Sequence, residues 1–168
     1  MLKMSVSPEI IELISALHQS LRDHNESLST AESLTAGGLS NALTTVPGAS
    51  DVFLGGVTAY VPAVKVSKLG VSAKLIEEKS VVSEEVALEM ARGAIKMFGS
   101  TWAIATTGVA GPGPSDGVPA GTVWVAFAGP IESTLELSLA GEREVVRNAT
   151  IASAIATFAS ILRQRSGK

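Results

Sequence analysis

The chain of 168 residues contains no cysteine, so disulfide frameworks, thiolate metal sites and cysteine nucleophiles are all excluded. Histidine is almost as scarce, and both histidines, His18 and His24, fall in the first expected helix or at its end. Neither has a plausible metal-ligand partner near it in the sequence. We therefore expect both to be solvated or to cap that helix, and we expect no metal site.

An excess of positive charge is also missing. The formal net charge is −3, and no run of lysine or arginine creates a basic patch that would attract a nucleic acid. No apolar run reaches the roughly 18 residues of a membrane-spanning helix, and the first residues lack an apolar signal segment. We therefore expect a cytoplasmic protein with no nucleic-acid partner and no membrane partner.

The composition suits one globular domain spanning residues 1–168, with 46% hydrophobic and 17% charged residues. Helical periodicity between caps such as Ser7 and stops such as Gly99 predicts helices near 8–21, 34–43, 62–70, 72–79, 83–99 and 142–163. Short apolar runs predict strands at 28–31, 52–60, 102–107, 122–128 and 133–139. Because helices and strands alternate early and a hairpin comes late, we expect a three-layer α/β/α fold with a mixed, mostly parallel sheet.

Three unusual stretches follow predicted strands, and open α/β sheets bind ligands at the carboxyl ends of parallel strands. The first is Ser29-Thr30-Ala31-Glu32-Ser33-Leu34-Thr35-Ala36-Gly37-Gly38. Its local sequence favours Ser33 as a cap of the following helix, with an exposed nucleophile as the alternative. The second holds Tyr60 and Lys65. The third, residues 108–121, has five glycines and three prolines and forms a loop, but its glycine spacing is not the dinucleotide-binding fingerprint.

Tyr60 and Lys65 each have a purely structural alternative, because the tyrosine can close the core and the lysine can be solvated. If Pro62 begins a helix, however, Lys65 lies about one turn in, where the positive end of the helix dipole disfavours its ammonium form. A general-base lysine needs its pKa lowered from roughly 10.4 toward about 7–8, and burial must supply most of that change. Serine activated by lysine is the easiest nucleophilic pair to assemble in this chain.

Five ordered motifs resemble one family, the C-terminal domain of the competence/damage-inducible protein CinA, whose stand-alone members are nicotinamide mononucleotide deamidases. The resemblance covers nearly the whole chain. It is carried by Ala31-Glu32-Ser33-Leu34-Thr35-Ala36-Gly37-Gly38, by Tyr60 and Lys65 with Leu69-Gly70-Val71, by Thr107-Gly108-Val109-Ala110-Gly111-Pro112, by Pro119-Ala120-Gly121-Thr122-Val123-Trp124, and by Gly141-Glu142-Arg143 with Val146-Arg147.

This resemblance implies hydrolysis of the nicotinamide mononucleotide carboxamide to nicotinate mononucleotide and ammonia, in pyridine nucleotide salvage, with no metal or organic cofactor. It implies that Ser33 is the nucleophile, Lys65 its base, and Tyr60 a hydrogen-bonding partner that orients the pair. Arg147 would engage the phosphate or the developing anion. The other expected substrate-binding residues, in the motif around the serine and in the glycine-rich loop, are Glu32, Thr35, Thr107, Gly108, Gly111 and Gly113.

The sequence departs from the family pattern at several positions around these groups. Leu34 replaces a cysteine, Ala36 a glycine, Pro62 an asparagine and Val118 a lysine, and Glu142 replaces an aspartate. Two alternatives therefore stay open beside the deamidase, namely a nucleotide-binding or regulatory module without turnover and a deamidase of a different small amide. Apolar helix faces on a small domain favour a homo-oligomer, such as a dimer.

Overall fold

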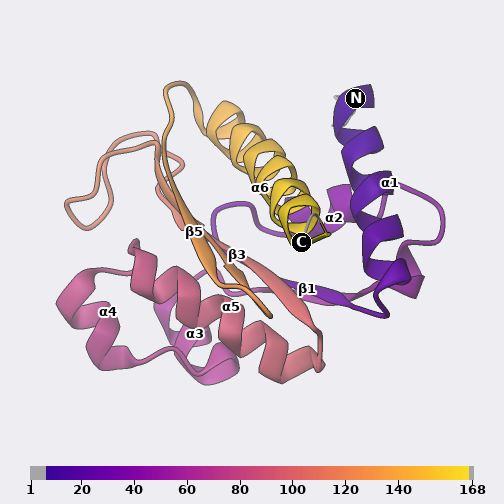
Figure 1. The fold of residues 1–168 in the computed structure, drawn as a ribbon. Helices are drawn as coiled ribbons and strands as arrows, with labels where there is room; N and C mark the ends of the chain where they lie inside the picture. The colour runs from indigo at the N-terminus through magenta and orange to yellow at the C-terminus, as the bar shows by residue number, and fades with distance from the viewer. Residues whose placement is uncertain (1–6, 167–168) are drawn as a thin grey trace.

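The computed structural model describes residues 7–166, which form five strands and six α-helices (Figure 1). The first residues, on which the expectation of no signal segment rests, lie outside this range. The strands are β1 (Leu28–Glu32), β2 (Phe53–Thr58), β3 (Trp102–Gly108), β4 (Thr122–Ala128) and β5 (Ser133–Ser138). The helices are α1 (Pro8–Asp23), α2 (Gly38–Leu43), α3 (Pro62–Leu69), α4 (Ala73–Lys79), α5 (Glu84–Phe98) and α6 (Arg143–Ser166), with a 3₁₀ turn at Ala49–Asp51.

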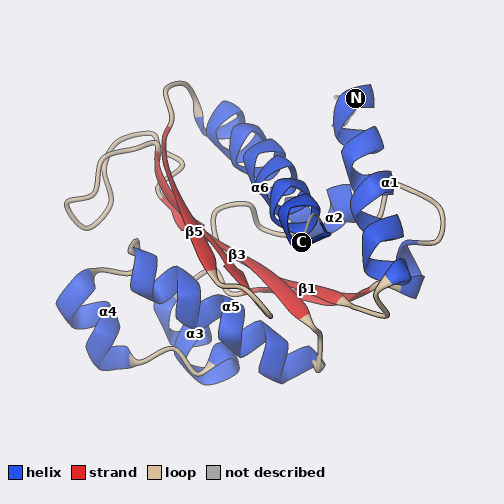
Figure 2. Cartoon of the chain, viewed as in Figure 1, coloured by secondary structure: helices blue, strands red, loops and turns tan. Residues whose placement is uncertain are grey.

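The strands form one mixed sheet in the order β2-β1-β3-β4-β5. β1 pairs in parallel with both β2 and β3, whereas β4 is antiparallel to its neighbours β3 and β5. Helices α1, α2 and α6 cover one face of the sheet, and α3, α4 and α5 cover the other (Figure 2). The predicted α/β fold with a mixed sheet and one antiparallel strand is therefore confirmed.

Each face of the sheet has its own core, and the two cores differ in side-chain size. Toward α1 and α6, Trp102 and Phe127 pack with Phe158, whose ring meets the Trp102 ring edge-on at 5.5 Å between centroids. Toward α5, the sheet presents alanines such as Ala103 and Ala105, which alternate along β3 with the large residues of the opposite face. Small residues on this face let α5 lie close to the sheet, and β3 is buried on both sides as its continuous apolar run predicts.

Local capping signals place the helix ends close to where the sequence predicts them. The Ser7 and Ser83 hydroxyls accept hydrogen bonds from the third backbone N–H that follows them, at the starts of α1 and α5. Gly70 and Gly99 end α3 and α5 in the left-handed conformation, with φ of 69° and 68°. Gly70 thus fixes the end of α3, and Pro62 begins this helix.

The two histidines of α1 behave differently from each other. His24 ends the helix, and its Nδ1 lies 2.8 Å from the carbonyl oxygen of Ser20, so the expected capping role is correct. His18 is fully buried, and neither ring nitrogen has a hydrogen-bond partner within residues 7–166. Burial lowers the pKa of His18 to about 4. The expected solvated or capping role is wrong for His18, because its spacing from Ile14 and Leu21 places it on the apolar stripe of the helix.

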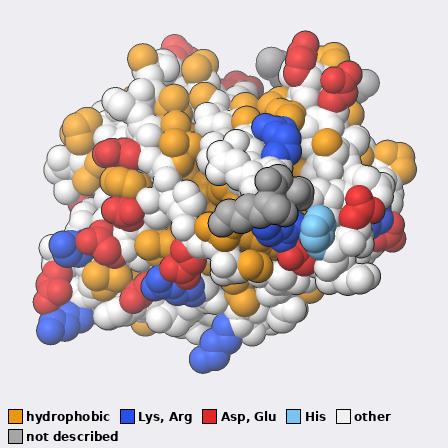
Figure 3. Space-filling view, in the orientation of Figure 1, with side chains coloured by type: hydrophobic (Ala, Val, Ile, Leu, Met, Phe, Trp, Pro, Cys, Tyr) orange, Lys and Arg blue, Asp and Glu red, His pale blue; other side chains and the backbone are white. Residues whose placement is uncertain are grey.

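Helix α6 is long and apolar enough to cross a membrane by length and composition alone. In this structure the apolar residues of α6 belong to the hydrophobic core. Ala154, Phe158 and Leu162 are buried where α6 packs against α1 and the sheet. On the face of the molecule shown in Figure 3, acidic and basic side chains are interspersed.

Candidate active site

Ser33 lies immediately after β1, at the carboxyl end of the central parallel strands. Its backbone N–H donates to the carbonyl of Thr106 on β3 at 2.9 Å, which holds the residue against the sheet edge. The Ser33 side chain is largely buried, and its Oγ lies 2.8 Å from the Nζ of Lys65. The expected juxtaposition of these two residues is thus present, although they are 32 positions apart in the sequence.

Lys65 is 1% exposed and has no carboxylate partner within residues 7–166. Pro62 begins α3, so Lys65 lies in the first turn and its chain reaches back toward the end of β2. Its Nζ donates to the carbonyl oxygens of Ala59 at 2.6 Å and Tyr60 at 3.4 Å, in addition to its contact with Ser33. Desolvation of the charged amine lowers the pKa of Lys65 to about 8.

The hydrogen bonds around Lys65 suit a neutral amine as well as an ammonium. A neutral amine keeps two N–H donors and one lone pair, and the site offers two carbonyl oxygens and one serine hydroxyl. In that state the lone pair accepts the hydrogen bond of the Ser33 hydroxyl. The lysine is therefore placed to remove the proton of the serine.

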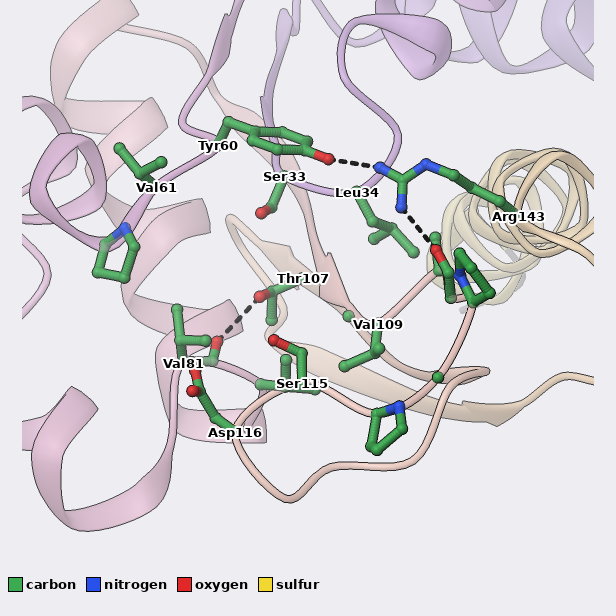
Figure 4. A pocket seen from close by; sticks show the side chains of 18 of the residues that line it. Ser33, Leu34, Tyr60, Val61, Val81, Thr107, Val109, Ser115, Asp116 and Arg143 are labelled. Atoms are coloured by element: carbon green, nitrogen blue, oxygen red, sulfur yellow. Dashed lines mark hydrogen bonds between the residues drawn. The ribbon is translucent and has the colours of Figure 1, made fainter.

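Ser33 and Lys65 line a cavity of about 300 Å³ that opens to solvent. Thr107 lies on one wall with its hydroxyl donating to the carbonyl of Val81 at 2.9 Å (Figure 4). The glycine-rich loop forms another wall, which includes Gly108, Gly111 and Gly113. This volume falls within the range of small-molecule sites, roughly 300–1,000 Å³. Within residues 7–166, no group of three or more histidines and carboxylates is arranged to hold a metal ion.

Ser33 does not cap the helix that follows it, which corrects the interpretation favoured by its local sequence. Helix α2 begins only at Gly38, after a turn in which Ala36 and Gly37 have φ of 49° and 90°. Its free amides are satisfied by Glu32, whose carboxylate accepts hydrogen bonds from the backbone N–H groups of Gly37, Leu39 and Ser40. The Ser33 hydroxyl therefore takes no part in capping α2, and it contacts Lys65 instead.

Three residues expected to bind substrate lie outside the cavity lining. Glu32 is 1% exposed and is engaged with α2 as described above. The Thr35 hydroxyl is buried against that of Thr106 at 2.8 Å. Arg147 donates from its Nη2 to the carbonyl of Thr35 at 3.1 Å, so its guanidinium supports the backbone behind the serine. In this structure all three residues hold the serine loop in shape.

Tyr60 and Arg143 form the rim of the cavity. The side chain of Tyr60 extends toward Arg143, and its hydroxyl accepts a hydrogen bond from the Nη2 of Arg143 (Figure 4). The Nη1 of Arg143 donates to the carbonyl oxygen of Gly111 at 2.9 Å. The sequence places Arg143 in a family motif but predicts no role for it, although its position at the start of a helix, two residues after Gly141, is visible in the sequence.

The fold and the site together define a three-layer α/β domain with a buried serine–lysine pair beneath a glycine-rich loop. The family model described as the CinA C-terminal domain matches residues 11–162, and the chain belongs to this family.

Similar proteins carry the same family name. The CinA-like protein of Synechococcus sp. (strain RCC307) is 51% identical over 119 residues, which cover 70% of this chain and 28% of that protein. The CinA-like protein of Rippkaea orientalis is 43% identical over 141 residues, which cover 81% of this chain and 34% of that protein. The chain therefore spans about a third of the length of these curated relatives.

Two crystal structures share the fold along nearly their full length. The competence damage-inducible protein A (ComA) of Klebsiella pneumoniae superposes with a TM-score of 0.88 at 33% identity, covering 92% of this chain and 97% of that chain. A CinA superfamily protein of Escherichia coli superposes with a TM-score of 0.86 at 36% identity, covering 95% of this chain and 94% of that chain.

Proposed function

We propose that this chain hydrolyses the carboxamide of nicotinamide mononucleotide to nicotinate mononucleotide and ammonia. The observation that carries the proposal is the 2.8 Å contact between the Nζ of Lys65 and the Oγ of Ser33 in an open cavity. A buried lysine without a carboxylate partner is costly for the folded state unless its neutral form is used. Membership in the CinA C-terminal domain family supports the substrate class.

In the proposed reaction, Ser33 Oγ attacks the amide carbon while the lone pair of neutral Lys65 takes the hydroxyl proton. The resulting ammonium donates that proton to the amide nitrogen, the C–N bond breaks, and ammonia leaves. A water molecule then attacks the acyl-serine ester, with Lys65 again the base, and its ammonium returns the proton to Ser33 as the carboxylic acid departs and releases its own proton to solvent. No net proton is lost from the dyad in one cycle.

Backbone amides near the serine supply a site for the oxyanion. The backbone N–H of Ser33 already donates to the carbonyl of Thr106, so it is not available to stabilise the oxyanion. The N–H groups of Leu34 and Ala110, both residues of the cavity lining, make no hydrogen bond within the described part of the chain. An amide directly after the nucleophile together with one from a neighbouring loop is a common oxyanion arrangement.

The departures from the family pattern leave these groups in place. Leu34 is 3% exposed and packs into the core, so an apolar residue is well accommodated beside the serine. Pro62 occupies the first position of α3, where its missing N–H costs no hydrogen bond. Val118 is not a residue of the cavity lining, and its backbone pairs with Ser115, which is. These contacts favour turnover over a module that only binds nucleotide.

The direct test is release of ammonia from nicotinamide mononucleotide by the purified chain, followed by chromatography of nicotinate mononucleotide. We expect equal amounts of the two products. Calorimetry that detected nucleotide binding with no ammonia would instead identify a binding module, and turnover of another amide alone would reassign the substrate.

The pH dependence of kcat/KM is expected to follow the neutral fraction of Lys65. With a pKa of about 8, only about a tenth of the amine is neutral at pH 7. Activity should therefore rise about tenfold for each pH unit below 8 and level off above it, because the base must be deprotonated in the free enzyme. Initial rates between pH 6 and 10 would measure this, and a rate that stayed flat through pH 8 would argue against a lysine base.

A further inference from the structure

The charged side chains of the active-site cavity are arranged so that an anion has one place to bind. Among the described residues that line the cavity, only Lys65, Asp116 and Arg143 carry charge. The three donors of the Lys65 ammonium are used by Ser33 Oγ and the carbonyls of Ala59 and Tyr60, so it has none left for a ligand. Asp116 repels an anion. Arg143 is thus the available cation.

The Arg143 guanidinium is held in place before any ligand arrives. One terminal nitrogen donates to the Tyr60 hydroxyl and the other to the carbonyl of Gly111, from two different walls of the cavity. These contacts use two of its five N–H donors, which leaves three for a ligand. Asp116 lies at the opposite end of the cavity, beside Thr107 and Ser115 (Figure 4). The cavity is therefore polarised, with its positive end at Arg143.

Arg147, four positions along α6, is less suited to bind an anion. One of its terminal nitrogens donates to the carbonyl of Thr35. It lines a second cavity, on the side of α6, that lacks Ser33 and Lys65, whereas Arg143 lines both this cavity and the one that holds Ser33. Of the two arginines, therefore, only Arg143 can contact a ligand that also reaches Ser33.

We infer that Arg143 binds the phosphate of the substrate and that Tyr60 positions Arg143, so that the site selects phosphorylated nucleosides over free nucleosides. This inference rests on the proposed function, because it assigns the two ends of the substrate of that reaction to the two ends of the same cavity. The amide lies at Ser33 and the phosphate at the rim. The Tyr60 hydroxyl acts on the arginine, whereas the Tyr60 contact with Lys65 is made by its backbone carbonyl.

The test compares kcat/KM for nicotinamide mononucleotide and for nicotinamide riboside, which lacks only the phosphate. The wild type should prefer the mononucleotide, and Arg143→Met should reduce that preference by about 10- to 100-fold, the cost of losing hydrogen bonds to a charged group. The ratio of the two kcat/KM values measures the preference, and thermal unfolding close to that of the wild type would show that the variant is folded. Arg163→Met, an exposed position on the same helix, is the matched control and should keep the wild-type preference.

Tyr60→Phe separates the two roles of the tyrosine, because it removes the hydroxyl and keeps the carbonyl that faces Lys65. We expect a severalfold higher KM for the mononucleotide, with kcat and the pH inflection near 8 unchanged. A fall in kcat with a shifted inflection would show that Tyr60 orients the dyad instead, and would overturn its assignment to Arg143.

The remaining outcomes distinguish the inference from the function beneath it. If the wild type turns over neither compound, the proposed function fails. If it turns over both with equal kcat/KM, or if Arg147→Met and not Arg143→Met removes the preference for the phosphate, the function stands and the inference is overturned.

Discussion

Replacing Ser33 by alanine should reduce ammonia release by on the order of 10⁴-fold or more, because the only nucleophile of the proposed mechanism is removed. Lys65→Met should cause a loss of similar size, since the serine hydroxyl then has no base within hydrogen-bond distance. The two residues act as one unit, so the double variant should be no slower than either single variant. Ammonia release under single-turnover conditions measures all three.

Two features make this experiment decisive. Lys65→Met removes a buried amine that the fold must desolvate, and methionine fills a similar volume, so the variant should remain folded in thermal unfolding. Lys68→Met, an exposed position one turn further along α3, is the matched control and should keep full activity. Losses that added up in the double variant would show that serine and lysine act in separate steps, and full activity of Ser33→Ala would remove the nucleophile from the mechanism.

Much of this site is predictable because its parts have local signals. The strand before Ser33, the proline that begins α3 and the scarcity of other nucleophiles all appear in the sequence, and they make serine and lysine the easiest nucleophilic pair to assemble. The local sequence around Ser33 nevertheless favoured a helix cap, and the roles of Ser33 and Lys65 came from the resemblance to the family. The carboxyl ends of neighbouring parallel strands then bring such residues to one edge of the sheet. Local signals of this kind also predicted the caps of α1 and α5.

The roles of Glu32, Arg143 and His18 depend on tertiary packing, which periodicity does not encode. Arg143 meets Tyr60 across 83 positions of sequence, through the connection from β5 into α6. The alternation of side chains between the two faces of a strand does not predict whether an acidic residue at the end of that strand faces a ligand or the start of the next helix. For His18, the apolar stripe of α1 predicted burial and its residue type predicted solvation, and packing decided in favour of burial.

Glu32→Ala should destabilise the fold by about 3–5 kcal/mol, because each buried amide that loses its only acceptor costs about 1–3 kcal/mol. The Glu32 carboxylate is 1% exposed and accepts from the backbone N–H groups of Gly37, Leu39 and Ser40 at 3.1, 2.9 and 2.8 Å. It also accepts from the Ser40 hydroxyl at 2.6 Å. Helix α2 has only six residues, so no distant turn compensates for a lost first turn.

Urea unfolding followed by circular dichroism would measure this loss. Glu136→Ala is the matched control, because it removes an exposed glutamate from an edge strand and should change the free energy of unfolding by less than about 0.5 kcal/mol. Activity adds a second observable, since the loop that Glu32 ties to α2 also carries Ser33. If Glu32→Ala were as stable as the control while losing substrate affinity, the carboxylate would belong to the substrate site and its bonds to α2 would be incidental. The expected opposite result, a fall in stability at least as large as any rise in KM, would show that a buried acid beside the nucleophile serves to hold the nucleophile's loop.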